Sequence, residues 1–269
     1  MLFRKSKPNR LQLTEHERHG MRKACKINAG LFDFLRAHVR AGVTTGEVDR
    51  LVYEFTVKNG HIPAPLGYQQ FPKSCCTSVN NIICHGIPGA YVLKDGDIVN
   101  VDCTTIVDGW HGDSSETFLI GRTSELARQV TQCAFDAMWA AINAIGPNSP
   151  VSAIGDAVVA EAKKYNFSVV REFVGHGVGK KFHQEPSIPH YPTRAARTTK
   201  LEPGMCFTVE PMINSGQRYT VVDKLDNWTV RTRDGGLSAQ FEHTVLMTEA
   251  GPEILTPTQT GPQQGHRFV

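Results

Sequence analysis

The stretch that decides the fold is Lys94–Ile120, which reads KDGDIVNVDCTTIVDGWHGDSSETFLI. Apolar and polar side chains alternate along both of its halves, and this alternation is typical of β-strands. The dipeptide Asp108-Gly109 between the halves is a preferred two-residue hairpin turn. A turn at that point places Thr104 opposite Asp113. The stretch therefore predicts an antiparallel hairpin, around which we expect the rest of the chain to be built.

The hairpin would bring two carboxylates to one face of the sheet. Asp102 becomes a diagonal neighbour of Asp113, at roughly 7–8 Å between backbones. Two carboxylates directed into one buried space repel each other unless a cation lies between them. Asp-rich turns are also common in solvated loops. The hairpin alone therefore leaves a metal site and a solvated loop as equal alternatives.

The composition is that of an ordinary soluble globular protein, with 269 residues, 40% hydrophobic, 20% charged and a net charge of +3. This mild charge does not argue for a nucleic-acid surface, and the basic opening MLFRKSKPNR is interpreted as a frayed end rather than an RNA contact. Seven cysteines without CxxC spacing favour free thiols in a reducing compartment over disulfides or a thiolate zinc site. The chain has no apolar run of membrane-spanning length and no secretory signal at its start. We expect a cytoplasmic protein.

Capping residues and apolar periodicity predict two helices before the hairpin and two after it. Thr14 opens the first, which we expect to run to about Ala41, and Thr44 opens the second, which ends near Asn59-Gly60. The polar tail after Thr256 is expected to be loose. The other predicted elements are a helix at 124–145, a helix capped by Ser149 with Pro150 at its first position, and strands at 75–84, 168–174, 205–213, 219–222, 228–231 and 240–248.

An internal repeat relates the two halves of the chain. LKDGDIVNVD, which ends at Asp102, matches LEPGMCFTVE, which ends at Glu210, with leucine, glycine, valine and the final acid in identical places. Each copy follows two predicted helices and precedes a second acidic strand, which carries Asp113 in one half and Glu242 in the other. The repeat predicts a duplicated α/β domain with a pseudo-two-fold axis.

Superposing the halves brings the four acids together. Each acid faces away from apolar neighbours on its strand, as an inward-facing ligand would. With one imidazole added, this oxygen-rich set suits manganese, iron or cobalt better than a structural thiolate zinc. Such a set can hold two divalent ions if two carboxylates bridge them at roughly 3.5–4 Å separation.

Four motifs in this order resemble those of the methionine aminopeptidases, which are metallopeptidases of the pita-bread fold: VDCTTIVDGWHGDSS, GHGVGKKFHQEP, FTVEPM and QFEHT. The likeness runs from about Thr14 to Thr256. It implies one pita-bread domain over 1–269 with a core at 14–256, of α/β (α+β) class, in which an antiparallel sheet is covered by two helix pairs. The short gap between His176 and Glu210 resembles the compact bacterial type 1 form rather than type 2.

The resemblance also implies roles for particular residues. The metal ligands would be Asp102, Asp113, His176, Glu210 and Glu242, with Asp113 and Glu242 bridging two ions of cobalt, manganese, iron or zinc. The catalytic residues would be His85, His183 and Glu210. The methionine side chain would lie against Tyr68, Phe71, Cys76, Phe182 and Trp228. Three further histidines match no role and are expected to be satisfied or solvated: His111, His190 and His243.

The implied reaction is removal of the initiator methionine from nascent proteins whose second residue is small. Two cations lower the pKa of a bridging water, and Glu210 accepts its proton as general base. The resulting hydroxide attacks the first peptide carbonyl, whose oxyanion is held by metal and His183, while His85 interacts with the scissile amide. The free α-amine would bind near Asp102, which restricts cleavage to the first residue.

Two departures from the family and two rival functions accompany this interpretation. Gln184 replaces a frequent glutamate beside His183, and Phe71 replaces a frequent tyrosine; both bear on fine specificity.

The rival functions are an Xaa-Pro dipeptidase or aminopeptidase of the same fold, and a non-enzymatic pita-bread binding module. We expect a monomer whose partner is the N-terminal methionine of nascent chains, with ribosome association possible and with no membrane or specific nucleic-acid partner.

Overall fold

A computed structural model describes residues 11–269, so the basic opening expected to be frayed lies outside the described residues. Helix α1 (Glu15–Leu35) begins at the predicted capping box, in which Thr14 and Glu17 satisfy each other's backbone N–H groups. The helix ends at Leu35 rather than near Ala41. A turn follows directly, in which His38 and Val39 donate their N–H groups to the carbonyl of Leu35, and Gly42, at φ 87°, then donates its N–H to the carbonyl of Leu93.

The other helices follow the predictions except at one start. Helix α2 (Thr45–Lys58) is capped by Thr44 and α3 (Glu125–Asn143) by Ser124. Helix α4 (Ser152–Lys164) does not begin at a Ser149 cap, because the Ser149 hydroxyl accepts the N–H of Gly146 instead. Ser149–Pro150 forms strand β6, which pairs with β10 (Lys200–Leu201), and a short α5 (Arg194–Thr198) was not predicted.

The main sheet is antiparallel throughout. Its strands, in spatial order, are β1 (Ile62–Pro63), β4 (Ile98–Val107), β5 (Trp110–Leu119), β16 (Glu242–Thr248), β11 (Cys206–Val209), β8 (Gly175–Gly177) and β9 (Gln184–Ile188), with β2 (Cys76–Val79) on β4 and β17 (Gly251–Ile254) on β16. The predicted hairpin is β4–β5, with Thr104 opposite Asp113 as expected. Asp108 and Gly109 both have positive φ, at 51° and 78°, as a two-residue hairpin turn of this kind requires.

Three predicted strands are each broken in two. The break at Asn80 separates β2 from β3 (Ile82–Cys84), and the break at Glu210-Pro211 separates β11 from β12 (Met212–Asn214), because proline cannot continue a ladder. Phe241 separates β15 (Ser238–Gln240) from β16. The parts β3, β12 and β15 leave the main sheet and join smaller sheets with β7 (Ser168–Val169), β13 (Thr220–Val222) and β14 (Val230–Thr232). The breaks leave Glu210 and Glu242 at strand ends.

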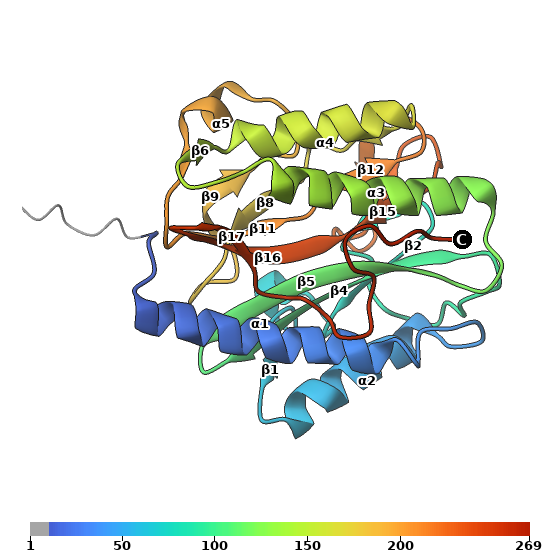
Figure 1. Cartoon of the computed structure of the whole chain (residues 1–269). Helices are drawn as coiled ribbons and strands as arrows, with labels where there is room; N and C mark the ends of the chain where they lie inside the picture. The colour runs from blue at the N-terminus through green and yellow to red at the C-terminus, as the bar shows by residue number, and fades with distance from the viewer. Residues whose placement is uncertain (1–10) are drawn as a thin grey trace, which may run out of the picture.

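The two halves repeat the same arrangement. The first contributes α1, α2, β4 and β5, the second contributes α3, α4, β11 and β16, and β5 lies beside β16 where the halves meet. One apolar core lies under α1 and α2, with Phe32 and Val101, and another under α3 and α4, with Phe135 and Phe207. In Figure 1 the two helix pairs lie above and below the band of strands. This arrangement confirms the predicted α/β class and its duplicated halves.

The C-terminal tail is not loose, contrary to the prediction. It runs between α1 and α3 in Figure 1, where it is the dark red segment. The Asp33 carboxylate on α1 accepts the N–H of Thr260, and Phe268 packs against Phe135 of α3 and against Phe241. The polar segment is held by hydrogen bonds to α1 at one point and by the packing of Phe268 on α3 at another.

All seven cysteines are free and buried. Within residues 11–269, no helix combines the length and the apolar character that crossing a bilayer demands.

Candidate metal centre and substrate pocket

Every residue to which the sequence assigned a role lines one pocket of about 430 Å³. The acids come from neighbouring strands of the main sheet, the histidines from loops and β8, and the aromatic residues from the loops around them. Six lining residues were not predicted: Pro65, Gln69, Glu172, Phe173, Val174 and Met212. Glu172 and Phe173 immediately precede the GHG motif, and Met212 follows Glu210 by two positions, so sequence proximity could have indicated them.

Strand register explains why the carboxylates gather. Directly paired residues of an antiparallel sheet share a face, and Ser115 pairs with Asp102 on one side and with Glu242 on the other. Asp113 lies two residues before Ser115 on the same strand, so it points to that face as well. Glu210 follows β11, which pairs with β16.

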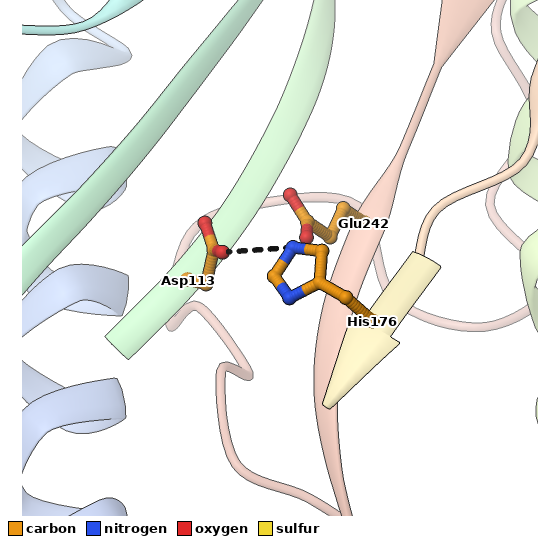
Figure 2. A group of neighbouring side chains, drawn as sticks. All are labelled: Asp113, His176 and Glu242. Atoms are coloured by element: carbon orange, nitrogen blue, oxygen red, sulfur yellow. Dashed lines mark ion pairs between the residues drawn. The ribbon is translucent and has the colours of Figure 1, made fainter. Parts of the chain in front are cut away.

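The ligand atoms of Asp113, His176 and Glu242 all lie within 4.8 Å of one another (Figure 2). Nε2 of His176 is 3.7 Å from Oδ2 of Asp113, the pair joined by the dashed line in Figure 2, and 3.6 Å from Oε1 of Glu210. Nδ1 of His176 lies 3.0 Å from the carbonyl oxygen of Gly177 and donates its proton there. This contact leaves the Nε2 lone pair directed at the acids, as a metal-ligating imidazole requires.

The electrostatics of the cluster favour a cation. Burial raises the pKa of Asp102 to about 7, and burial with repulsion from Asp102 raises the pKa of Asp113 well above its ordinary value. The pKa values of Glu210 and Glu242 are raised well above the ordinary range, first by burial. Burial lowers the pKa of His176 to about 3, so the imidazole is neutral. Three buried acids, the half-buried Asp102 and one neutral imidazole fit divalent metal of the manganese, iron, cobalt or zinc kind.

Hydroxyl groups hold the carboxylates from outside the cluster. Thr104 donates to Oδ1 of Asp113 at 2.7 Å, and Thr208 donates to Oε1 of Glu210 at 2.6 Å. Gln240 donates its amide to Oε2 of Glu210 at 3.1 Å. Such outer contacts fix the orientation of ligands. The sequence placed Thr104 opposite Asp113, as the register confirms, but indicated no hydrogen bond to an acid for any of the three residues.

His85 lies at a strained turn directly after β3. Its φ is 57°, an uncommon value for a residue with a side chain. The next residue must be glycine, because a Cβ on Gly86 would lie 2.2 Å from the carbonyl oxygen of Thr77. The imidazole packs edge-on against Phe173 and Trp228, and burial lowers its pKa to about 4. A neutral imidazole therefore faces the pocket.

The remaining histidines divide as predicted. His183 lies in the pocket, with its ring centroid 4.3 Å from that of His176. The histidines without a predicted role are satisfied by hydrogen bonds at His111 Nδ1 with Gly179 O, at His190 Nε2 with the N–H of Glu210, and at His243 Nδ1 with the Thr256 hydroxyl. His190 thus contacts the backbone of a candidate ligand, which the sequence did not indicate.

Aromatic side chains form the apolar side of the pocket. The buried Phe71 packs edge-on against Trp228, with ring centroids 5.1 Å apart, and Tyr68 packs against Phe182 at 5.0 Å. Cys76 is buried beside them and pairs with Asp102 across the sheet. The apolar recess therefore adjoins the carboxylates directly.

Comparison with known proteins identifies the family of this chain. Residues 19–249 match metallopeptidase family M24. The chain is 47% identical over 243 residues to a methionine aminopeptidase of Rickettsia prowazekii, covering 90% of this chain and 93% of that one, and 43% identical over 238 residues to one of Escherichia coli, covering 88% and 89%.

Solved structures of similar fold include methionine aminopeptidases. The crystal structure of methionine aminopeptidase from Rickettsia prowazekii superposes with a TM-score of 0.88 at 46% identity, covering 91% of this chain and 99% of that one. The prolidase from Pyrococcus furiosus superposes with a TM-score of 0.72 at 22% identity over 93% of this chain and 66% of its own, a likeness of fold alone. The chain therefore belongs to metallopeptidase family M24 and, within it, to the methionine aminopeptidases.

Proposed function

We propose that this chain removes the N-terminal methionine from peptides and nascent proteins whose second residue is small. The observation that carries the proposal is a single pocket in which a carboxylate and imidazole cluster adjoins an apolar recess. The cluster suits metal-assisted hydrolysis, and the recess suits an unbranched thioether side chain.

The residues that would hold divalent metal ions are Asp102, Asp113, His176, Glu210 and Glu242. Bound divalent cations at such a site polarise a carbonyl group and make water a stronger acid. The raised pKa values of the carboxylates support this assignment, because a cation is what would keep them ionised at neutral pH.

The chain's own residues would carry the proton transfers and the binding. Glu210, whose carboxylate is oriented by Thr208 and Gln240, would accept a proton from the attacking water. His183 would donate a hydrogen bond to the carbonyl oxygen as that oxygen gains negative charge. His85, held at its strained turn, would contact the amide of the bond that breaks. The free α-amine would lie near Asp102, which would limit the reaction to the first residue.

One set of assays tests the proposal. Metal-free protein, verified by elemental analysis, should release no methionine from Met-Ala-Ser, and added manganese, iron, cobalt or zinc should restore release. The same preparation is offered an Xaa-Pro dipeptide as the substrate of the rival function. Full activity without metal, or cleavage of the Xaa-Pro dipeptide in place of Met-Ala-Ser, would contradict the proposal.

We also propose that the chain is one domain and works as a cytoplasmic monomer on nascent chains at the ribosome. The pairing of β5 with β16 and the packed tail support one folding unit. Seven buried free thiols suit a reducing compartment. A single cooperative unfolding transition, a monomer mass by light scattering and co-sedimentation with ribosomes are the tests of these three statements.

A further inference from the structure

Tyr68 contacts a candidate catalytic histidine through its hydroxyl. The phenol oxygen lies 2.9 Å from Nδ1 of His183, and the two ring centroids are 5.2 Å apart. Sequence reasoning had assigned Tyr68 only to the apolar wall of the pocket. A hydrogen bond of this length and a ring contact on the same residue define both the position and the rotation of the imidazole.

The backbone that carries Tyr68 is strained. Gly67, which precedes Tyr68, has φ 82°, and Gln69 and Gln70, which follow it, have φ 46° and 70°. Side chains rarely adopt these values, and strain of this kind persists where the surrounding structure imposes it, often at functional sites. Both glutamines are exposed, so burial of their side chains does not account for the strain.

Local hydrogen bonds close this turn. Gly67 donates its N–H to the carbonyl of Phe71 at 2.8 Å, and Phe71 donates its own N–H to the carbonyl of Tyr68 at 2.8 Å. The closed turn directs the phenol ring onto Phe182 and His183, which belong to a loop more than a hundred residues later in the chain. The strained turn therefore places Tyr68 in contact with the loop that carries Phe182 and His183.

The direction of the hydrogen bond decides what His183 can do. A neutral imidazole has one N–H and one lone pair, and the group bonded to one nitrogen selects the tautomer. If the phenol donates to Nδ1, the ring proton lies on Nε2, which is the form able to donate to a carbonyl oxygen. If Nδ1 donates to the phenol, Nε2 is only an acceptor and cannot stabilise an oxyanion.

We infer that Tyr68 is a positioning residue whose hydroxyl donates to Nδ1 of His183 and so keeps a proton on Nε2 for the carbonyl oxygen of the substrate. This inference rests on the proposed role of His183 in methionine release. The phenol ring would still line the pocket, and the hydroxyl would act only through the histidine.

A double-mutant cycle tests the inference with Met-Ala-Ser as substrate. Tyr68→Phe should lower kcat roughly tenfold and change KM little, because the aromatic ring remains. His183→Ala should lower kcat further, and adding Tyr68→Phe to it should change kcat less than about twofold. Tyr91→Phe is the matched control, since it removes a hydroxyl bonded to Asp97 at 2.9 Å outside the pocket, and it should leave kcat unchanged.

The outcomes separate the inference from the function on which it rests. If Tyr68→Phe lowers kcat equally in the wild-type and His183→Ala backgrounds, Tyr68 acts without His183 and the inference is wrong while the function stands. If His183→Ala has wild-type kcat, the role of His183 fails and the inference fails with it.

Nitrogen-15 NMR of histidine-labelled protein measures the tautomer of His183 directly, and this tautomer would not change if Tyr68 only packed against the ring. The His183 signals, identified by their loss in His183→Ala, should be those of an Nε2–H tautomer in the wild type and in Tyr91→Phe. Tyr68→Phe should convert them to a mixture of tautomers. An Nδ1–H tautomer in the wild type, or no change in Tyr68→Phe, would overturn the inference.

Discussion

The hydroxyl of Thr208 donates to Oε1 of Glu210 at 2.6 Å, and the Oγ1 atom of that hydroxyl accepts the backbone N–H of His176 at 3.0 Å. One side chain therefore ties together two candidate ligands that come from different strands. Thr208 is fully buried, so no water replaces either hydrogen bond. The spacing between the two ligands depends on this hydroxyl as well as on the sheet.

Thr208→Val should weaken metal binding without unfolding the protein. Valine keeps the shape of the side chain but removes both hydrogen bonds. Loss of such an outer contact typically lowers metal affinity by about 10- to 100-fold. Thr208→Ser is the control, because it retains the hydroxyl. The measurement is calorimetric titration of the metal-free proteins with Mn²⁺, and equal affinities for the valine and serine variants would contradict the prediction.

Metal affinity should depend on pH in a direction that the carboxylates fix. Burial raises the pKa of Asp102 to about 7 and the pKa of Asp113 well above its ordinary value. Below those pKa values the metal-free site holds protons that a cation must displace, so affinity should fall about tenfold per pH unit for each displaced proton. Affinity should rise with pH through about 7, the pKa of Asp102, and should level only above the pKa values of the other carboxylates.

Calorimetry in two buffers of different ionisation enthalpy measures the protons released. Asp102→Asn should release about one proton fewer than the wild type near pH 6, because the amide carries no titrating proton. An affinity for Mn²⁺ that is constant between about pH 6 and about pH 8 would contradict the raised pKa values.

His85→Ala should lower kcat roughly a hundredfold or more while metal content stays at the wild-type level. His85 lies in the pocket but its ring contacts are Phe173 and Trp228 rather than the carboxylates. The measurements are Met-Ala-Ser kinetics and elemental analysis of one preparation. Metal loss in proportion to the loss of rate would make His85 a ligand instead.

Phe268→Ala should lower the free energy of unfolding by about 1–3 kcal/mol, because the ring packs against Phe135 and Phe241 between the two helix layers. Arg267→Ala is the control from the same tail. Its ion pair with Asp136 is exposed, so the loss should stay within about 0.5 kcal/mol. Urea unfolding measures both, and a Phe268→Ala variant as stable as the wild type would show that the tail contributes nothing.

Local chemistry made much of the fold predictable. The Asp108-Gly109 turn fixes the hairpin register and thereby the side of the sheet that carries Asp102 and Asp113. Thr14 and Thr44 identify helix starts because their hydroxyls cap the first turns. These features depend on residues a few positions apart, so a sequence displays them directly.

Features that depend on distant contacts were not predictable. The Ser149 cap failed because Ser149–Pro150 pairs with a strand some fifty residues later, a contact that no local pattern records. The tail is polar in composition, and only Phe135 of α3 and Phe241, both far away in the sequence, give Phe268 a packing site. Within the pocket, motifs indicated the acids, the histidines and most of the aromatic residues, but the hydrogen bond between Tyr68 and His183 joins two loops and required coordinates.

Substrate discrimination should follow the shape of the recess. Phe71 and Trp228 are packed edge-on, and Phe71 is only 3% exposed, so this part of the pocket wall has little freedom to move. Methionine is unbranched and fits a narrow recess, whereas leucine branches at its γ-carbon. A change of shape of this size is worth about 1–3 kcal/mol, so kcat/KM for Leu-Ala-Ser should be about 10- to 200-fold lower than for Met-Ala-Ser.

Met-Lys-Ser should be cleaved slowly as well, because its second side chain would have to pass the imidazoles of His176 and His183, whose ring centroids are 4.3 Å apart. The three peptides are compared on one preparation: equal values for the first two would remove the recess as the methionine site, and rapid cleavage of Met-Lys-Ser would remove the preference for a small second residue.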